Sequence, residues 1–212
     1  EISICPASNV PKNVAVSTVP IINSGLSRYA ASGLTTNLKD DVPSEAITAP
    51  ASAAAPAPSG RGLGIACGLD AGTYVAHVAE VTVDEGTGNV QVDRMFCAQE
   101  MGVVVNPMGA TMQMEGCITM GLGYAFKEHI RFRGGDILDR NFDTYQLPRF
   151  SDLPEIKTVL VPNDELAPQG GGEPAIICIG AVLANAIYDA CGARLFTMPF
   201  TPESVLTAIP AS

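Results

Sequence analysis

The sequence contains no tryptophan, only two histidines and few positively charged residues. Twelve basic side chains stand against twenty-two acidic ones, which gives a net charge of −10. A surface for nucleic acid or an anionic membrane needs clustered lysine and arginine, so this balance argues against both. The chain also lacks a run of roughly 18 consecutive apolar residues, which argues against a membrane span. Any bound phosphate would have to be held by backbone amides and a few polar groups.

The chain lacks a Cys-x-x-Cys pair. Its six cysteines are widely and irregularly spaced: Cys5, Cys67, Cys97, Cys117, Cys178 and Cys191. This spacing disfavours a zinc ribbon or an iron–sulfur cluster held by this chain alone. The favoured interpretation is a set of buried thiols that pack as small apolar groups.

A secretion signal is also missing from the first thirty residues. Since a signal can be removed or carried by a partner, both the cytoplasm and the periplasm of a bacterium stay open.

Enough apolar sequence is present for a substantial core, because 47% of the 212 residues are hydrophobic and 16% are charged. The segment Ile47–Gly60 is rich in alanine, proline and serine and shows no apolar period, which indicates a linker or a long surface loop. We therefore divide the chain into residues 1–60, with no assigned role, and a folded part, residues 61–212.

Strands and helices are mixed in the folded part. The predicted elements are a hairpin of Thr73–Asp84 and Val90–Ala98, a helix from Pro107 toward Phe126, a hairpin within His129–Phe142, a strand at Ile156–Pro162, and helices at Pro174–Cys191 and from Pro202. Asn106 and Thr201 are suitable N-caps before a proline, and Gly192 is a suitable left-handed cap. Because no βαβ rhythm is visible, we expect an α+β domain of mixed sheets and hairpins with packed helices.

Glycines and methionines crowd the helix predicted from Pro107. Each of its four interior glycines costs about 1 kcal/mol relative to alanine, which indicates close approach of another backbone or a ligand. These glycines are Gly109, Gly116, Gly121 and Gly123. Five nearby methionines are predicted to fill gaps in the core: Met95, Met101, Met108, Met112 and Met114.

Three consecutive glycines, Gly170–Gly172, precede Glu173 and Pro174. In one interpretation the glycines form a plain loop and Glu173 is a carboxylate that the positive end of the following helix stabilises. In the other, the glycines let a substrate or cofactor approach the main chain, and Glu173 is a general base. The spacing alone does not choose between these interpretations.

Gln113 lies near the start of the helix predicted from Pro107 and carries both donors and acceptors. Such an amide suits a neutral, highly functionalised ring such as a pterin. A solvated helix face is the alternative.

Three stretches together resemble a known family: "GVVVNPMGATMQMEGCITMGLGYAFKEHI", "NFDTYQLPRFSDLPEI" and "GGGEPAIICIGAVLANAIYDACGARLFTMPFTPE". They occur in the order found in the C-terminal part of the molybdopterin-binding large subunit of the xanthine oxidase family. The resemblance is to the branch of isoquinoline 1-oxidoreductase and aldehyde-dehydrogenase-like molybdenum hydroxylases in particular. It runs from Gly62 to about Leu206 and implies that residues 61–212 are the C-terminal portion of a molybdopterin-binding domain.

The resemblance assigns roles to individual residues. It implies that Glu173 is the catalytic base beside molybdenum, that Gln113 contacts the molybdopterin, and that Gly171 and Gly172 belong to the cofactor loop. Valine is usual at the position of Gly171, so this loop is looser here. The metal is held by the pterin dithiolene in this family, so the resemblance implies no metal ligand from the protein.

Tyr145 and Arg149 have two open interpretations. They line the substrate entrance, or they order the loop that leads to the strand at Ile156–Pro162.

The implied function is part of a molybdenum hydroxylase that oxidises an aldehyde or an N-heteroaromatic compound with water as the oxygen source. Several family motifs are missing, including the glycine-rich phenylalanine motif and the Gly-Gln-Gly loop, so the remaining part of the molybdenum-binding subunit must complete the site. Electrons would pass to [2Fe–2S] clusters on a partner chain. The resemblance leaves open the cytosine dinucleotide form of the pterin and a further partner with FAD or haem. The alternative function is a non-catalytic structural half of an oxidoreductase assembly.

Overall fold

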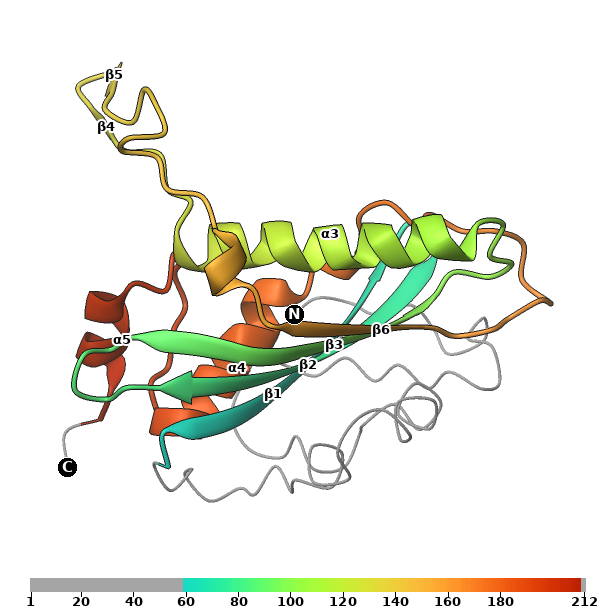
Figure 1. Ribbon diagram of the computed structural model, residues 1–212, viewed down its shortest axis with the longest axis horizontal. Helices are drawn as coiled ribbons and strands as arrows, with labels where there is room; N and C mark the ends of the chain where they lie inside the picture. Colours follow the sequence, from blue (N-terminus) through green and yellow to red (C-terminus); the bar gives the residue numbers. More distant parts are fainter. Residues whose placement is uncertain (1–58, 211–212) are drawn as a thin grey trace, which may run out of the picture.

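The computed structural model describes residues 59–210 (Figure 1). The N-terminal segment and almost all of the Ala/Pro/Ser-rich stretch lie outside these residues, so the predictions made there are not addressed. The larger sheet has strand order β1-β2-β3-β6, and β4 and β5 form a separate small hairpin. The strands are β1 (Arg61–Asp70), β2 (Thr73–Val83), β3 (Val90–Glu100), β4 (Phe132–Arg133), β5 (Asp136–Ile137) and β6 (Glu155–Leu160). The helices are α3 (Pro107–Phe126), α4 (Ile179–Cys191) and α5 (Pro202–Ala208), with short 3₁₀ turns η3 (Phe150–Asp152) and η4 (Pro174–Ile176).

Strands β2 and β3 form the predicted antiparallel hairpin, which is confirmed with a bulge between Glu80 and Val81. Strand β6 is also confirmed, and it pairs with β3 in parallel. A parallel pair needs a crossover connection, and α3 lies within it. The α+β architecture is confirmed, and it contains one β-α-β connection that the sequence pattern did not indicate.

Strand β1 was missed by the sequence analysis, because glycine disfavours strands and three glycines interrupt its apolar pattern. The structure explains two of them. A Cβ at Gly62 would collide with the Ala186 carbonyl oxygen, and one at Gly64 would collide with the Val182 carbonyl oxygen. The glycines of β1 therefore let α4 lie directly on the strand.

Helix α3 begins and ends where the sequence predicts. Asn106 is its N-cap and accepts a hydrogen bond from the Gly109 N–H at 3.0 Å. Helix α5 is confirmed in the same way, with Thr201 accepting from the Ser204 N–H at 3.2 Å.

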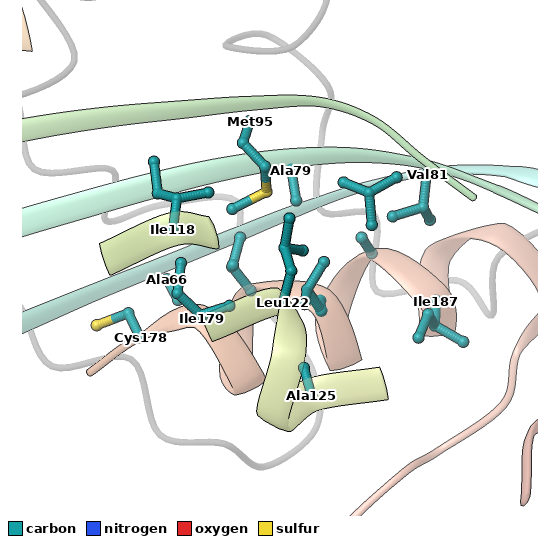
Figure 2. Packing of buried hydrophobic residues seen from close by; sticks show 14 of the residues in the cluster. Ala66, Ala79, Val81, Met95, Ile118, Leu122, Ala125, Cys178, Ile179 and Ile187 are labelled. Carbon is teal, nitrogen blue, oxygen red and sulfur yellow. The ribbon is translucent and has the colours of Figure 1, made fainter. Parts of the chain in front are cut away.

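Helices α3 and α4 pack on one face of the larger sheet and share a core with it. Figure 2 shows Ile118 and Leu122 of α3 and Ile179 of α4 near Met95 and Ala79 of the sheet. A smaller cluster covers part of the opposite face, around Phe96 and Val78. The main core thus fixes α3, α4 and the strands relative to one another.

The helix predicted at Pro174–Cys191 is divided in two. A 3₁₀ turn follows Glu173, and the α-helix starts only at Ile179. The predicted cap is confirmed, since Gly192 has a φ of 77°. The span Pro174–Cys191 has a mean hydropathy of 1.6 and the length to cross a membrane, but 56% of it is buried inside the domain. In this structure the span serves as a core element.

The glycines of α3 have different environments. A Cβ at Gly121 would overlap the side chain of Ile179, so close approach is confirmed there, whereas no atom lies within 4 Å of a Cβ at Gly116. Met95 and Met114 are buried as predicted. Met108 and Met112 are exposed, so the prediction that they fill the core was wrong.

Candidate functional site

The glycine triplet is anchored to the turn between β1 and β2. The Gly170 N–H donates to the Ala71 carbonyl oxygen at 3.1 Å, and the Thr73 hydroxyl donates to the Gly170 carbonyl oxygen at 2.5 Å. One residue earlier, the Gln169 N–H donates to the Met101 carbonyl oxygen at 2.9 Å. These bonds fix the N-terminal side of the triplet to the ends of the central strands.

Helix α3 holds the other side of the triplet. The Gln113 side-chain amide donates to the Gly172 carbonyl oxygen at 2.6 Å, and the Cys117 thiol donates to the same oxygen at 3.2 Å. Gln113 and Cys117 are four residues apart, so they lie on the same face of the helix. The carbonyl oxygen of the peptide between Gly172 and Glu173 therefore accepts hydrogen bonds from two side chains.

Glu173 is exposed and occupies the N-cap position of η4, but its side chain forms no capping bond. Within residues 59–210 its carboxylate forms no ion pair. No atom lies within 4 Å of a Cβ at Gly172. The structure thus presents a carboxylate next to one glycine with open space at its Cβ position, on a fixed loop.

The floor beneath the triplet is formed by the half-buried Met101 and the buried Gln99. A Cβ at Gly171 would meet the methyl group of Met101, and the side-chain nitrogen of Gln99 lies 3.8 Å from that Cβ position. The side-chain oxygen of Gln99 is buried and has no hydrogen-bond partner in the described part of the chain. An unpaired buried acceptor of this kind costs free energy unless a donor reaches it.

Two titratable groups beneath the site are held neutral. Burial raises the pKa of the Cys117 thiol, the Gln113 contact lowers it in part, and the negative charge of Glu173 raises it further. Burial lowers the pKa of His77 to about 4, and the nearby backbones of Ala175 and Phe96 offset this effect only in part. Cys117 therefore remains a protonated donor to Gly172 at neutral pH.

Tyr145 and Arg149 lie toward the other end of α3. The Tyr145 hydroxyl donates to a carboxylate oxygen of Glu128 at 2.6 Å, just beyond the C-terminus of the helix. Ten residues of α-helix separate Gln113 from Gly123, which corresponds to about 15 Å. The structure therefore does not bring this pair together with Gln113 and Glu173, and their place at the substrate entrance stays a prediction.

A cavity of about 160 Å³ lies at the same distal end of α3, not at Glu173. Its lining includes Leu122, Phe126, Lys127, Pro148 and Phe200.

Cys117 and Gln99 are the residues of this site that sequence reasoning missed. Cys117 was predicted to be a buried thiol, which is confirmed, but its bond to Gly172 was not foreseen. Its spacing of four residues from Gln113 was the available signal. Gln99 carried no such signal, because only the fold brings β3 under the triplet. Among the described residues, no group of three histidine, cysteine or acidic side chains is arranged to hold a metal ion.

Comparison with known proteins relates part of this chain to a family. The family model described as "Molybdopterin cofactor-binding domain" matches residues 69–154. The beta subunit of the isoquinoline 1-oxidoreductase of Brevundimonas diminuta is 33% identical over 148 residues, which is 70% of this chain and 19% of that protein. A subunit of the nicotinate dehydrogenase of Pseudomonas putida is 34% identical over 136 residues, 64% of this chain and 12% of that protein. The matched region belongs to the molybdenum-binding subunits of the xanthine oxidase family.

Solved structures show the same fold for this molybdopterin-binding region. The aldehyde oxidoreductase of Desulfovibrio desulfuricans is 29% identical with a TM-score of 0.59, covering 65% of this chain and 16% of that chain. Quinoline 2-oxidoreductase of Pseudomonas putida 86 is 27% identical with a TM-score of 0.60, covering 65% and 18%. The chain spans between 12% and 20% of the length of the curated relatives it matches. Most of each relative therefore lies beyond the matched region.

Proposed function

We propose that the chain is part of a molybdenum hydroxylase in which Glu173 acts as the general base. The observation that carries this proposal is the position of the carboxylate. It is exposed, it has no capping bond, and it follows a main-chain stretch that Gln113 and Cys117 hold in place. A general base needs this kind of fixed position, because proton transfer requires an acceptor within hydrogen-bond reach of the donor.

The residues present fit a molybdopterin. Gly172 has open space where a side chain would stand, so a flat ring can approach the main chain. The Gln113 amide nitrogen is engaged with Gly172, which leaves the amide oxygen of this exposed side chain as an acceptor for a pterin N–H. We therefore assign Gln113, Gly171 and Gly172 to cofactor binding. When bound, the molybdenum of this cofactor exchanges electrons with the substrate and makes coordinated water more acidic.

The role of Glu173 is to accept a proton on a carboxylate oxygen from the water-derived nucleophile. A positioned base of this kind typically contributes about 10²- to 10⁴-fold in rate. The bonds from Gln113 and Cys117 keep the Gly172–Glu173 peptide in one orientation, which fixes the backbone position from which the Glu173 side chain extends.

The substrate class is an aldehyde or an N-heteroaromatic compound. Relatives named for nicotinate, isoquinoline and aldehydes support this class. We further propose that the remaining part of the molybdenum-binding subunit completes the pocket and that a partner with [2Fe–2S] clusters receives the electrons. The cytosine dinucleotide form of the pterin and a terminal FAD or haem partner belong to the same proposal, in which residues 61–212 form the C-terminal portion of the subunit.

The test is Glu173→Gln in the whole complex. We expect turnover of an aldehyde or isoquinoline to fall at least about 100-fold, while the molybdenum content and the thermal midpoint stay unchanged. Glu165→Gln is the matched control, since Glu165 is an exposed acid in the same connection. Full activity of Glu173→Gln would remove the assignment.

A structural role in an oxidoreductase assembly is the second candidate. The two candidates differ in where molybdenum lies. Anomalous scattering from the metal close to Glu173 supports the enzyme, and metal remote from Glu173 supports the scaffold.

A further inference from the structure

The segment between α3 and η3 extends away from the body of the domain. We call residues 129–150 the arm. Figure 1 shows its two short strands, β4 and β5, projecting beyond the end of α3 and away from the larger sheet. The family model covers residues 69–154 and so includes the arm, which makes the arm part of the molybdopterin-binding domain.

The arm is organised by its own polar groups. Arg131 and Asp139 form an ion pair at 2.6 Å, and the Asp139 carboxylate also accepts the Arg131 backbone N–H at 2.6 Å. The Asp139 side chain is fully covered, and its bonds with Arg131 hold the pKa of that carboxyl well below its usual range. Tyr145 connects the base of the arm to Glu128. The arm therefore has a defined shape.

The apolar side chains of the arm face outward. Seven of the sixteen exposed large hydrophobic side chains of the described domain lie on it: Ile130, Phe132, Ile137, Leu138, Phe142, Leu147 and Phe150. Phe132 and Phe142 are each 75% exposed, and Phe150 is 95% exposed. Pairing polar groups internally while exposing aromatic rings is the reverse of an ordinary surface loop, and clustered exposed apolar groups mark interaction sites.

We propose that the arm docks onto the remaining part of the molybdenum-binding subunit. The length of the relatives supports this occupant, because the matched region makes up 12% of one curated relative and 20% of another, and the rest of each offers a large surface to this region. Four arginines and three aspartates give the arm a charge of +1 in a chain of −10, so it lacks the strong negative charge of the rest. This proposal rests on family membership and not on the chemistry assigned to Glu173.

The test is site-specific photo-crosslinking in the assembled oxidoreductase. The photoreactive analogue p-benzoylphenylalanine replaces Phe132 or Phe142, and crosslinked peptides are mapped by mass spectrometry after irradiation. Because both rings are exposed, the replacement leaves the fold of the domain intact. We expect both positions to crosslink to peptides of the molybdenum-binding subunit that lie outside residues 59–210.

Phe196 is the matched control, because it is the same residue type, is 82% exposed and lies between α4 and α5 rather than on the arm. We expect its crosslinking yield to this subunit to be at least fivefold lower. Crosslinks from Phe132 and Phe142 to a second copy of this chain, to an iron–sulfur partner, or to nothing would overturn the proposal. An equal yield from Phe196 would overturn the assignment of docking to the arm. None of these outcomes depends on turnover, so the role of Glu173 is tested separately.

Discussion

Two glycine-rich segments of this domain look alike in the sequence and serve opposite purposes. In β1, Gly62 and Gly64 have no side chain because the backbone of α4 occupies that space. In the triplet before Glu173, the space beside Gly172 is empty. Glycine in β1 thus allows packing within the domain, as Gly170 and Gly171 do against Ala71 and Met101, whereas Gly172 leaves the main chain open to a molecule from outside. The environment of the missing Cβ separates a structural glycine from a candidate binding glycine.

Gly64→Ala has the largest expected effect on stability. The added methyl group would meet the Val182 carbonyl oxygen and the Ala186 backbone, which cannot move as a flexible side chain can. We expect a loss of about 3 kcal/mol in the free energy of unfolding, measured by chemical denaturation. Gly86→Ala, in the turn between β2 and β3, is the control and should lose less than about 1 kcal/mol. Equal losses in both variants would contradict the packing role of β1.

Acid should lower the free energy of unfolding of the domain, because His77 is buried in its neutral form. In the unfolded chain His77 takes up a proton near pH 6.5, but burial delays this to about pH 4 in the folded protein. The free energy of unfolding should therefore fall as the pH decreases from 6.5 to 4, by up to roughly 3 kcal/mol. His77→Gln should reduce the slope in this window, which denaturation at several pH values measures. An unchanged slope would show that His77 is not the group responsible.

Gly172→Val tests whether the open space beside Gly172 is used in function. The new side chain has free space and the residue has no positive φ, so stability should change by less than about 0.5 kcal/mol. Turnover of the whole complex should nevertheless fall by roughly 10- to 100-fold, because the side chain fills the approach to the main chain beside Glu173. Steady-state kinetics and molybdenum analysis provide the measurement. Gly86→Val, at the opposite end of the strands, should keep activity, and equal activity of the two variants would show that the open space is not used.

Gly116→Ala has the smallest expected effect and the opposite sign. No atom lies near its Cβ position, and the residue is in the interior of α3. Alanine should therefore stabilise the domain by about 1 kcal/mol through helix propensity, seen as a raised denaturation midpoint of the chain. A loss of stability would mean that Gly116 is packed like Gly64.

Local signals in the sequence determined much of the fold. The caps at Asn106 and Thr201 act over three residues, and the β2–β3 hairpin depends on alternation and a turn, so each could be recognised from neighbouring residues alone. The ordered motifs around Gln113 and Glu173 likewise indicated the family, because each motif is a short run of adjacent residues. Chemistry that depends on neighbouring residues can therefore be predicted from their pattern.

Tertiary structure alone decided the rest, because those features depend on residues far apart in the chain. Strand β1 exists where glycines disfavour a strand, since α4 lies against it from more than a hundred residues away. The bonds from Gln113 and Cys117 to Gly172 span 59 and 55 residues. The separation of Tyr145 from Glu173 follows from the length and direction of α3. Sequence supplied the candidate site residues, and the packing of helices on the sheet decided which of them meet.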